Sequence, residues 1–152
     1  FNQLAHAVDG QVISSIGLGL CILVGIYRYD TEEDMDFLVK KMLKMRVYDD
    51  DNGKGQRLSV MQKDYEVLCI SQITLYHSIK GNKPDFHTAM LPKYSRDFFN
   101  KFIEKMKNFY KPEKIKVGAF GTHSVLSLHN EGPFTIVFES PTKRSNNTMK
   151  CG

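Results

Sequence analysis

Two short polar stretches hold most of the residues in this sequence that could do chemistry. The first is SQITLY, residues 71–76, in which Ser71, Gln72 and Thr74 interrupt a run of apolar, strand-forming residues. The second is NEGPFT, residues 130–135, in which a glycine and a proline precede a strand-like segment. Because proline cannot donate a hydrogen bond to a sheet ladder, this interruption marks either a turn or a place where the backbone itself has a function.

Familiar catalytic motifs are missing from the sequence. It has no GxGxxG, Walker A, HExxH or GxSxG pattern. Cys69 lies in an apolar strand pattern, where burial makes a thiol unreactive, and Thr74 has no base at a suitable spacing. His123 and His129 would lie about 20 Å apart along a strand, which is too far for one metal ion. The sequence therefore predicts no metal site and no cofactor.

Length and composition predict one globular domain. The chain has 152 residues, of which 41% are hydrophobic and 25% are charged. We expect a single domain over residues 1–140 and a polar tail over 141–152. The longest apolar run, residues 18–26, is shorter than the roughly 20 residues of a membrane helix, so no membrane association is expected. Three cysteines without CxxC spacing favour a reducing compartment, and the cytoplasm fits best.

The positive charge of the chain is unevenly distributed. The formal net charge is +4, and six lysines lie within one short segment that holds only two glutamates. Two interpretations stay open: the solvated face of a helix, or a surface that faces nucleic-acid phosphates. The six residues are Lys101, Lys105, Lys107, Lys111, Lys114 and Lys116.

The elements that would position these residues can be predicted from periodicity and turn chemistry. Asp9-Gly10 is typical of a two-residue hairpin turn, and Thr31 with Asp34 resembles a capping box that opens a helix over residues 30–45. A second helix is expected at about residues 95–110. Two helices that do not alternate strictly with the strands predict an α+β fold with a mostly antiparallel or mixed sheet. Strands are expected at 18–27, early in 46–55, and at 66–76, 114–120, 124–130 and 134–140.

The order and spacing of the motifs resemble those of the D-aminoacyl-tRNA deacylases, also called D-tyrosyl-tRNA deacylases. The resemblance runs from Phe1 to about Ser140, and the SQ and Asn-Glu-Gly-Pro openings match this family better than its sister family, whose motifs begin PQATL and TNGP. It implies a partly barrel-like, homodimeric hydrolase that cleaves D-aminoacyl-tRNA, or glycine on a noncognate tRNA, without a cofactor. The matching segments are SSIGLGLCILVGI, DTEED, LKMRVYDD, SQITLY, KGNKPDFHTAM, KVGAFG and NEGPFT.

The resemblance also implies roles for both polar stretches. The Gly132-Pro133 pair is expected as a cis peptide that enters the active site of the partner subunit and excludes L-amino acids by steric clash. The backbone amides of Gln72 and Ile73 would form an oxyanion hole, and Ser71, Gln72 and Thr74 would line the pocket for the terminal adenosine. The 2′-hydroxyl of the last ribose would assist in place of a side-chain base.

Further substrate contacts follow from the same resemblance. Phe86 of the KPDF segment would stack on the adenine or wall it in, unless it simply packs in the core. Pro84 would belong to the same substrate-binding surface, and Lys80 and Lys83 would hold phosphate. Ser124 would form part of the pocket wall.

Some positions depart from the family pattern. Ile73 stands where phenylalanine is usual, and FGTHS, with His123 and Ser124, stands where FGAYM is common. The Gln-Arg pair that buttresses the Gly-Pro motif in the family would precede Phe1, so we expect an N-terminal segment to be missing from this sequence.

Two other functions stay open at this point. One is a nucleic-acid-binding or interaction module on the same fold without catalysis. The other is editing of L-alanine on a noncognate tRNA, as in the sister family.

Overall fold

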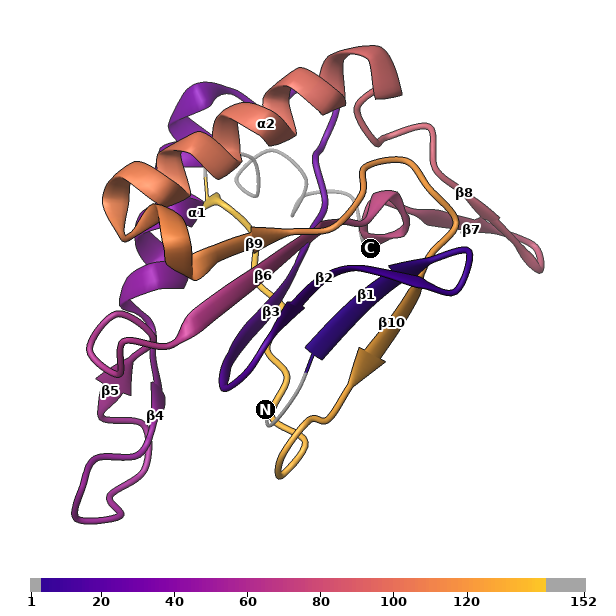
Figure 1. The fold of residues 1–152 in the computed structure, drawn as a ribbon. Coiled ribbons are helices and arrows are strands. Elements are labelled where there is room, and N and C mark those ends of the chain that lie inside the picture. Colours follow the sequence, from indigo (N-terminus) through magenta and orange to yellow (C-terminus); the bar gives the residue numbers. More distant parts are fainter. Residues whose placement is uncertain (1–3, 142–152) are drawn as a thin grey trace.

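The computed structural model describes residues 4–141, which form three layers (Figure 1). Two helices form the first layer, a parallel sheet in the order β3-β6-β9 the second, and an antiparallel sheet in the order β10-β1-β2 the third. The elements are β1 Leu4–Val8, β2 Gln11–Ile16, β3 Gly19–Val24, α1 Glu32–Lys44, β4 Arg46–Tyr48, β5 Leu58–Ser59, β6 Glu66–Ser71, η1 Ile73–Leu75, β7 Ser78–Lys80, β8 Lys83–Asp85, α2 Pro92–Phe109, η2 Pro112–Lys114, β9 Ile115–Val117 and β10 Val125–Leu128.

Strand β6 lies at the centre of the core and is buried on both faces. Val67 and Cys69 face the helices and pack in the main hydrophobic cluster with residues of α1 and α2 such as Leu43 and Met106. The alternate residues Leu68 and Ile70 pack on the other face against Ile16 of β2. Because successive side chains of a strand point to opposite faces, this single strand joins the two halves of the core.

The first hairpin turn and the two helices, which were predicted from neighbouring residues, are confirmed. Asp9 and Gly10 both have positive φ, at 50° and 77°, as the predicted two-residue turn between β1 and β2 requires. Helix α1 has the expected capping box, with the Thr31 amide donating to the Asp34 carboxylate over 2.9 Å. Helix α2 begins at Pro92, earlier than expected, since proline is well suited to the first turn of a helix.

Three strand predictions need correction. The strand expected over residues 66–76 ends at Ser71, and η1 follows it. The KGNKPDF segment, where no strand is expected, forms a hairpin of β7 and β8 around Gly81. Residues 134–140 alternate as a strand would, but no described strand pairs with them, and Val137 is 78% exposed. The alternation shows only that these residues could form a strand, since pairing depends on a neighbour.

The α+β class is confirmed, with both antiparallel and parallel pairs. The expected partial barrel is not closed, because the strands of residues 4–141 form four separate ladders. No helix in this described range is long and apolar enough to cross a membrane. Apart from Pro141, the expected tail lies outside the described residues.

Candidate functional site

The end of β6 presents two backbone amides that have no acceptor in the described part of the chain. Gln72 donates its amide hydrogen to the Val24 carbonyl over 2.8 Å, and the chain then leaves the sheet and coils into η1. Within this turn Leu75 and Tyr76 donate back to Gln72 and Ile73. The first amides of a helix have no acceptor within the helix. Those of Ile73 and Thr74 accordingly have none among residues 4–141.

This geometry bears on which amides are available for the expected oxyanion hole. The amide of Gln72 is already bonded to β3, so it is not available to a substrate oxygen. The amides without an acceptor in residues 4–141 are those of Ile73 and Thr74. The strand expected over residues 66–76 did not anticipate this, because only the turn after Ser71 leaves these two amides without an acceptor.

Hydrogen bonds from side chains in and beside the turn stabilise it. The Gln72 side-chain amide donates to the Thr74 hydroxyl over 2.5 Å. The Nδ1 atom of His77 lies 2.8 Å from the Thr74 carbonyl oxygen. A carbonyl can only accept a hydrogen bond, so Nδ1 is the donor in this contact. Sequence reasoning missed His77, although its spacing of three residues from Thr74 suits a contact across a tight turn.

The turn also packs closely on the end of β3. A Cβ atom built on Gly25 would lie 2.8 Å from Cβ of Leu75 and 3.1 Å from the Tyr76 ring. Burial is the main cause that raises the pKa of Tyr76, and the charges of Asp30 and Glu139 add to it. The phenol is thus neutral at physiological pH and serves as part of the support for η1.

The KPDF segment lies beside the same end of β3. Beyond β3, the Ile26 carbonyl accepts a hydrogen bond from the Met90 amide over 2.9 Å, and Tyr27 forms a β-bridge with Ala89. Phe86, which is half-buried, precedes this contact and accepts from the Ala89 amide over 3.1 Å. The continuation of β3 therefore links the turn after Ser71 to the segment that carries Phe86.

Charged residues of the β7–β8 hairpin precede Phe86 in the chain. Lys83 and Pro84 are exposed on β8. Asp85 contacts the His87 ring through Nδ1 and pairs with Lys80 at 3.6 Å. The hydrogen bond from His87 lowers the pKa of the Asp85 carboxyl, so the carboxylate stays ionised and holds both neighbours.

The Gly-Pro turn lies at the opposite end of the molecule from η1 within one chain (Figure 1). Leu128, at the end of β10, aligns through Leu4 of β1 with Ile16 at the end of β2. The next residue, Gly17, donates its amide to the side chain of Glu66, where β6 begins. Since β6 spans about 17 Å at the usual rise per residue, the turn and Ser71 are far apart.

The turn itself is well defined, but it is not a cis peptide. The Asn130 side chain accepts from the Phe134 amide over 3.1 Å and donates to the Thr135 hydroxyl over 2.9 Å. Gly132 has a φ of 74°, and no peptide bond in residues 4–141 is cis. The cis prediction is therefore wrong for this conformation, in which Pro133 has the trans form that is favoured by about 0.5–1 kcal/mol.

No hydrogen bond within residues 4–141 joins Ser124 or the lysine-rich segment to the turn after β6. Ser124 lies half-buried in the loop between β9 and β10 and forms no hydrogen bond with residues 71–75 in the described range. Five of the six lysines pair with carboxylates, so the segment is less positive than its sequence suggests. The pairs are Lys101–Glu32, Lys105–Glu32, Lys105–Asp36, Lys107–Glu104, Lys111–Asp64 and Lys114–Asp64.

Metal and thiol chemistry find no support in the described residues. Within residues 4–141 no group of three histidine, cysteine or acidic side chains could hold a metal ion. Burial raises the pKa of the Cys69 thiol strongly and that of Cys21 to about 11, so both thiols stay protonated. Cys69 is therefore unreactive, as predicted.

Fold and site together define an α+β protein that presents main-chain donors at the end of a central strand. Residues 3–139 match the family model described as D-Tyr-tRNA(Tyr) deacylase. D-aminoacyl-tRNA deacylase 1 of Homo sapiens is 47% identical over 92% of this chain and 67% of its own length. The chain belongs to the D-Tyr-tRNA(Tyr) deacylase family.

Two solved structures share this fold. A structure titled "c-Myc DNA Unwinding Element Binding Protein" is 45% identical, with a TM-score of 0.89 over 92% of this chain and 94% of that one. A second, titled as a probable eukaryotic D-amino acid tRNA deacylase, has a TM-score of 0.73 over 86% of this chain and 90% of that one, at 15% identity. At this low identity the second structure supports the fold alone.

Proposed function

We propose that this protein hydrolyses the ester between a D-amino acid, or glycine on a noncognate tRNA, and the 3′ end of tRNA. The observation that carries the proposal is the pair of available amides at Ile73 and Thr74, in the segment that holds the SQITL motif of the family. Two fixed donors at one turn suit the oxygen of an ester carbonyl, which gains negative charge in the transition state.

The reaction needs few side chains, because an aminoacyl ester is already activated. Water attacks the carbonyl carbon, and the charge that develops on the carbonyl oxygen is stabilised by the amides of Ile73 and Thr74. The carbon–oxygen bond to the ribose then breaks, and the leaving oxygen takes up the proton that the attacking water releases. The neighbouring 2′-hydroxyl of the ribose relays this proton, so no histidine or carboxylate base is required.

Selection against L-amino acids comes from the Gly132-Pro133 turn of a second copy in a homodimer. The distance between this turn and η1 in one chain supports an arrangement in trans. A proline has a fixed φ, and the turn is closed by the Asn130 side chain. A rigid main-chain wall rejects the wrong stereoisomer by overlap, whereas an adaptable pocket would only bind it more weakly.

The rest of the substrate lies along the turn after β6 and the β7–β8 hairpin. Ser71, Gln72 and Thr74 line the adenosine pocket, and Phe86 stacks on the adenine or walls it in. Pro84 and Lys83 extend this surface toward the phosphates, and Ser124 completes the wall. The protein acts in the cytoplasm, in keeping with the free thiols of Cys21 and Cys69.

A second candidate function is binding of nucleic acid without turnover. It is favoured by the structure whose title names a DNA-unwinding-element binding protein, since that chain is 45% identical to this one. In that case the polar site would bind the end of a nucleic-acid strand without hydrolysing an ester.

The deciding experiment follows ester loss from D-tyrosyl-tRNA, L-tyrosyl-tRNA and mischarged L-alanyl-tRNA. We expect rapid loss of the D-ester and survival of both L-esters. Binding of tRNA without any hydrolysis would support the second candidate, and preference for L-alanyl-tRNA would place the activity with the sister family.

Sharing of the site between subunits can be tested by mixing an inactive variant with an unselective one. The inactive variant carries Ile73→Pro, and the unselective variant, which replaces Gly132 and Pro133 by alanine, should hydrolyse both the D-ester and the L-ester. If the site is built in trans, subunit exchange restores rejection of the L-ester, because the working amides of each mixed dimer then face an intact turn from the Ile73→Pro subunit. No recovery of selectivity in a sample shown to contain mixed dimers would contradict the arrangement.

A further inference from the structure

Three tyrosine rings form a continuous series from the surface to the turn after β6. The ring of Tyr29 contacts that of Tyr27 edge to face, with centroids 5.6 Å apart. Tyr27 in turn lies 5.5 Å from Tyr76, which directly follows η1. Tyr29 is 63% exposed, and the guanidinium of Arg28 lies 4.8 Å from its ring centroid. The outer end of the series is thus an exposed aromatic ring with a cation beside it.

A second pair of the same kind lies on the first turn of α2. Tyr94 is 58% exposed, and the Lys93 ammonium lies 4.6 Å from its ring centroid. The first turn of α2 contains no acidic residue, although Asp97 follows one turn later.

Both tyrosine–cation pairs lie beside the same short stretch of main-chain hydrogen bonds. The Arg28 amide donates to the Thr88 carbonyl over 2.9 Å, and Met90, which donates to Ile26, lies just before α2. This pairing continues β3 and also flanks the segment that carries Phe86. Arg28, Tyr29, Lys93 and Tyr94, which we call the Tyr29–Tyr94 surface, therefore lie on elements next to the proposed active site.

We propose that the Tyr29–Tyr94 surface binds the single-stranded 3′ end of the RNA and guides it to the amides of Ile73 and Thr74. This inference rests on the proposed function. Each nucleotide of a single strand offers a flat base and a phosphate. An exposed ring with a neighbouring cation complements both, because bases stack on aromatic side chains and cations neutralise the phosphate.

The chemistry of the surface favours a single strand over a duplex. Bases inside a helix are stacked on one another and cannot reach a tyrosine ring, so a duplex would gain only the phosphate contacts. A single exposed tyrosine would be unremarkable. Here two such rings each have a cation beside them, and one of the rings leads through Tyr27 and Tyr76 to η1.

The test measures the affinity of the full chain for an uncharged RNA hairpin with and without a single-stranded 3′ tail. Tyr29→Ala and Tyr94→Ala should each weaken binding of the tailed hairpin about tenfold, the loss expected for one stacked base. Tyr29→Phe and Tyr94→Phe keep the rings and should bind as the wild type does. The tail-less hairpin should bind all these variants equally.

The cations are tested through the dependence of binding on salt. Arg28→Gln or Lys93→Gln should lower the slope of log affinity against log salt by about 0.7 for each phosphate that the variant no longer neutralises. Lys41→Gln is the matched control, since Lys41 lies 5.6 Å from the Phe37 ring on α1, and it should leave the tail-dependent part of binding unchanged. The surface is rejected if the alanine variants bind the tailed hairpin normally, or lose affinity equally for both hairpins.

Turnover separates this inference from the proposed function. With D-tyrosyl-tRNA, Tyr29→Ala should raise KM about tenfold and leave kcat unchanged, because the ring binds RNA and does not touch the ester. If the wild type hydrolyses the D-ester while RNA binding does not depend on either tyrosine, the proposed RNA-binding surface is rejected and the proposed function is retained. If the wild type hydrolyses no ester but binding of the tail depends on the tyrosines, the proposed function is rejected and the RNA-binding surface is retained.

Discussion

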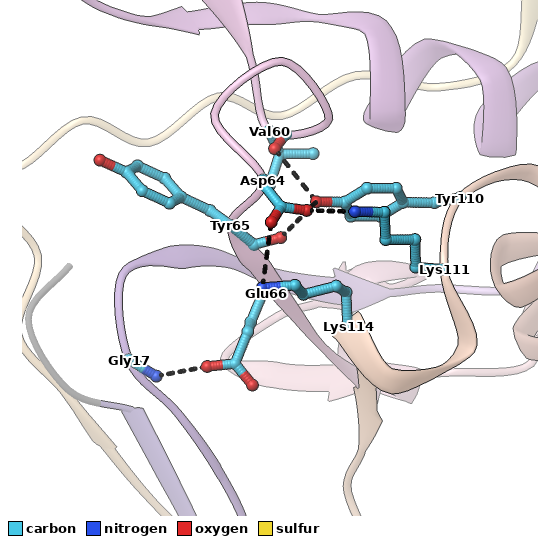
Figure 2. A network of polar contacts seen from close by, with 8 residues as sticks. All are labelled: Gly17, Val60, Asp64, Tyr65, Glu66, Tyr110, Lys111 and Lys114. Atoms are coloured by element: carbon cyan, nitrogen blue, oxygen red, sulfur yellow. Dashed lines mark hydrogen bonds and ion pairs between the residues drawn. The ribbon is translucent and has the colours of Figure 1, made fainter.

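The two ends of the paired strands β3 and β6 have opposite polar character. At the end where β6 begins, polar groups find partners within the chain (Figure 2). The Glu66 amide donates to the Leu18 carbonyl over 3.2 Å, and the Glu66 carboxylate accepts from the Gly17 amide over 3.1 Å. The Tyr110 hydroxyl, 2.9 Å from the Tyr65 carbonyl oxygen, ties the end of α2 to the turn before β6.

At the other end the same strands leave polar groups available. Ile73 and Thr74 keep two amides without acceptors among residues 4–141, and the half-buried Gln72 side chain meets the Thr74 hydroxyl. An amide donor without an acceptor destabilises a protein core. At an open surface, however, water or a substrate can accept its hydrogen bond. The satisfied end, where β6 begins, therefore fixes the strands, and the open end, at η1, has amide donors available for a ligand.

The largest expected effect comes from removing one of the available amides. Ile73→Pro deletes an amide hydrogen that no described acceptor uses, at the first position of a turn, where proline is tolerated. The extended Gln72 suits a following proline, and η2 already begins with Pro112. We expect kcat for D-tyrosyl-tRNA to fall about 10²–10³-fold, with an unfolding midpoint near that of the wild type.

Ile73→Ala is the matched control for the amide. It removes the same side chain but keeps the amide hydrogen, so it should retain most of the activity. Equal losses from the proline and alanine variants would assign the effect to the side chain and reject the amide as the oxyanion donor.

The next largest effect is expected at the satisfied end. A Cβ atom on Gly19 would lie 1.9 Å from the Glu66 carbonyl oxygen, so Gly19→Ala must separate β3 from β6. We expect a loss of about 3 kcal/mol in the free energy of unfolding, measured by urea denaturation. Gly17→Ala, whose Cβ would meet its nearest atom at 3.8 Å, is the control and should change stability little. Similar values for the two variants would contradict the close approach.

A smaller effect on activity is expected where β3 supports η1. Gly25→Ala would place a Cβ 2.8 Å from Cβ of Leu75 and so displace the turn that holds the amides. Displacement by a fraction of an ångström should lower kcat/KM for D-tyrosyl-tRNA by about tenfold. Gly17→Ala again serves as the control, now for activity, because it lies at the opposite end of the strands. Unchanged turnover in Gly25→Ala would mean that the placement of η1 does not depend on β3.

The sequence predicted what is encoded locally. The Asp9-Gly10 hairpin and the Thr31–Asp34 capping box depend on residues within a few positions of one another, and both are confirmed. The family was also predicted correctly from motifs whose order and spacing are specific.

Features that depend on distant neighbours could not be predicted in this way. Residues 134–140 have the alternation of a strand without a described partner. The amide of Gln72 was assigned to the substrate because nothing local shows that Val24 accepts it. The lysine pairs Lys101–Glu32 and Lys111–Asp64 join residues far apart in sequence, so the local density of lysines overstated the charge of the surface.

The smallest expected effect concerns a single carboxylate at the satisfied end. Asp64 lies 2.8 Å from the Lys111 ammonium, and this hydrogen bond is the main cause that lowers the pKa of the carboxyl. A lowered pKa in the folded state stabilises the fold above the ordinary carboxyl range near pH 4, and the contribution is lost as pH falls below it. Asp64→Asn tests this, since asparagine tolerates the positive φ of 55° found here.

At pH 7, Asp64→Asn should therefore melt at a lower temperature than the wild type, and the two curves should converge as the pH falls below the ordinary carboxyl range. Hydrolysis of D-tyrosyl-tRNA should be unchanged, because Asp64 lies at the far end of β6 from η1. Asp51→Asn, an exposed carboxylate in the turn after β4, is the control and should shift neither curve. A melting difference that persists in acid would mean that Asp64 stabilises the protein through its turn geometry, with no contribution from the charge of Lys111.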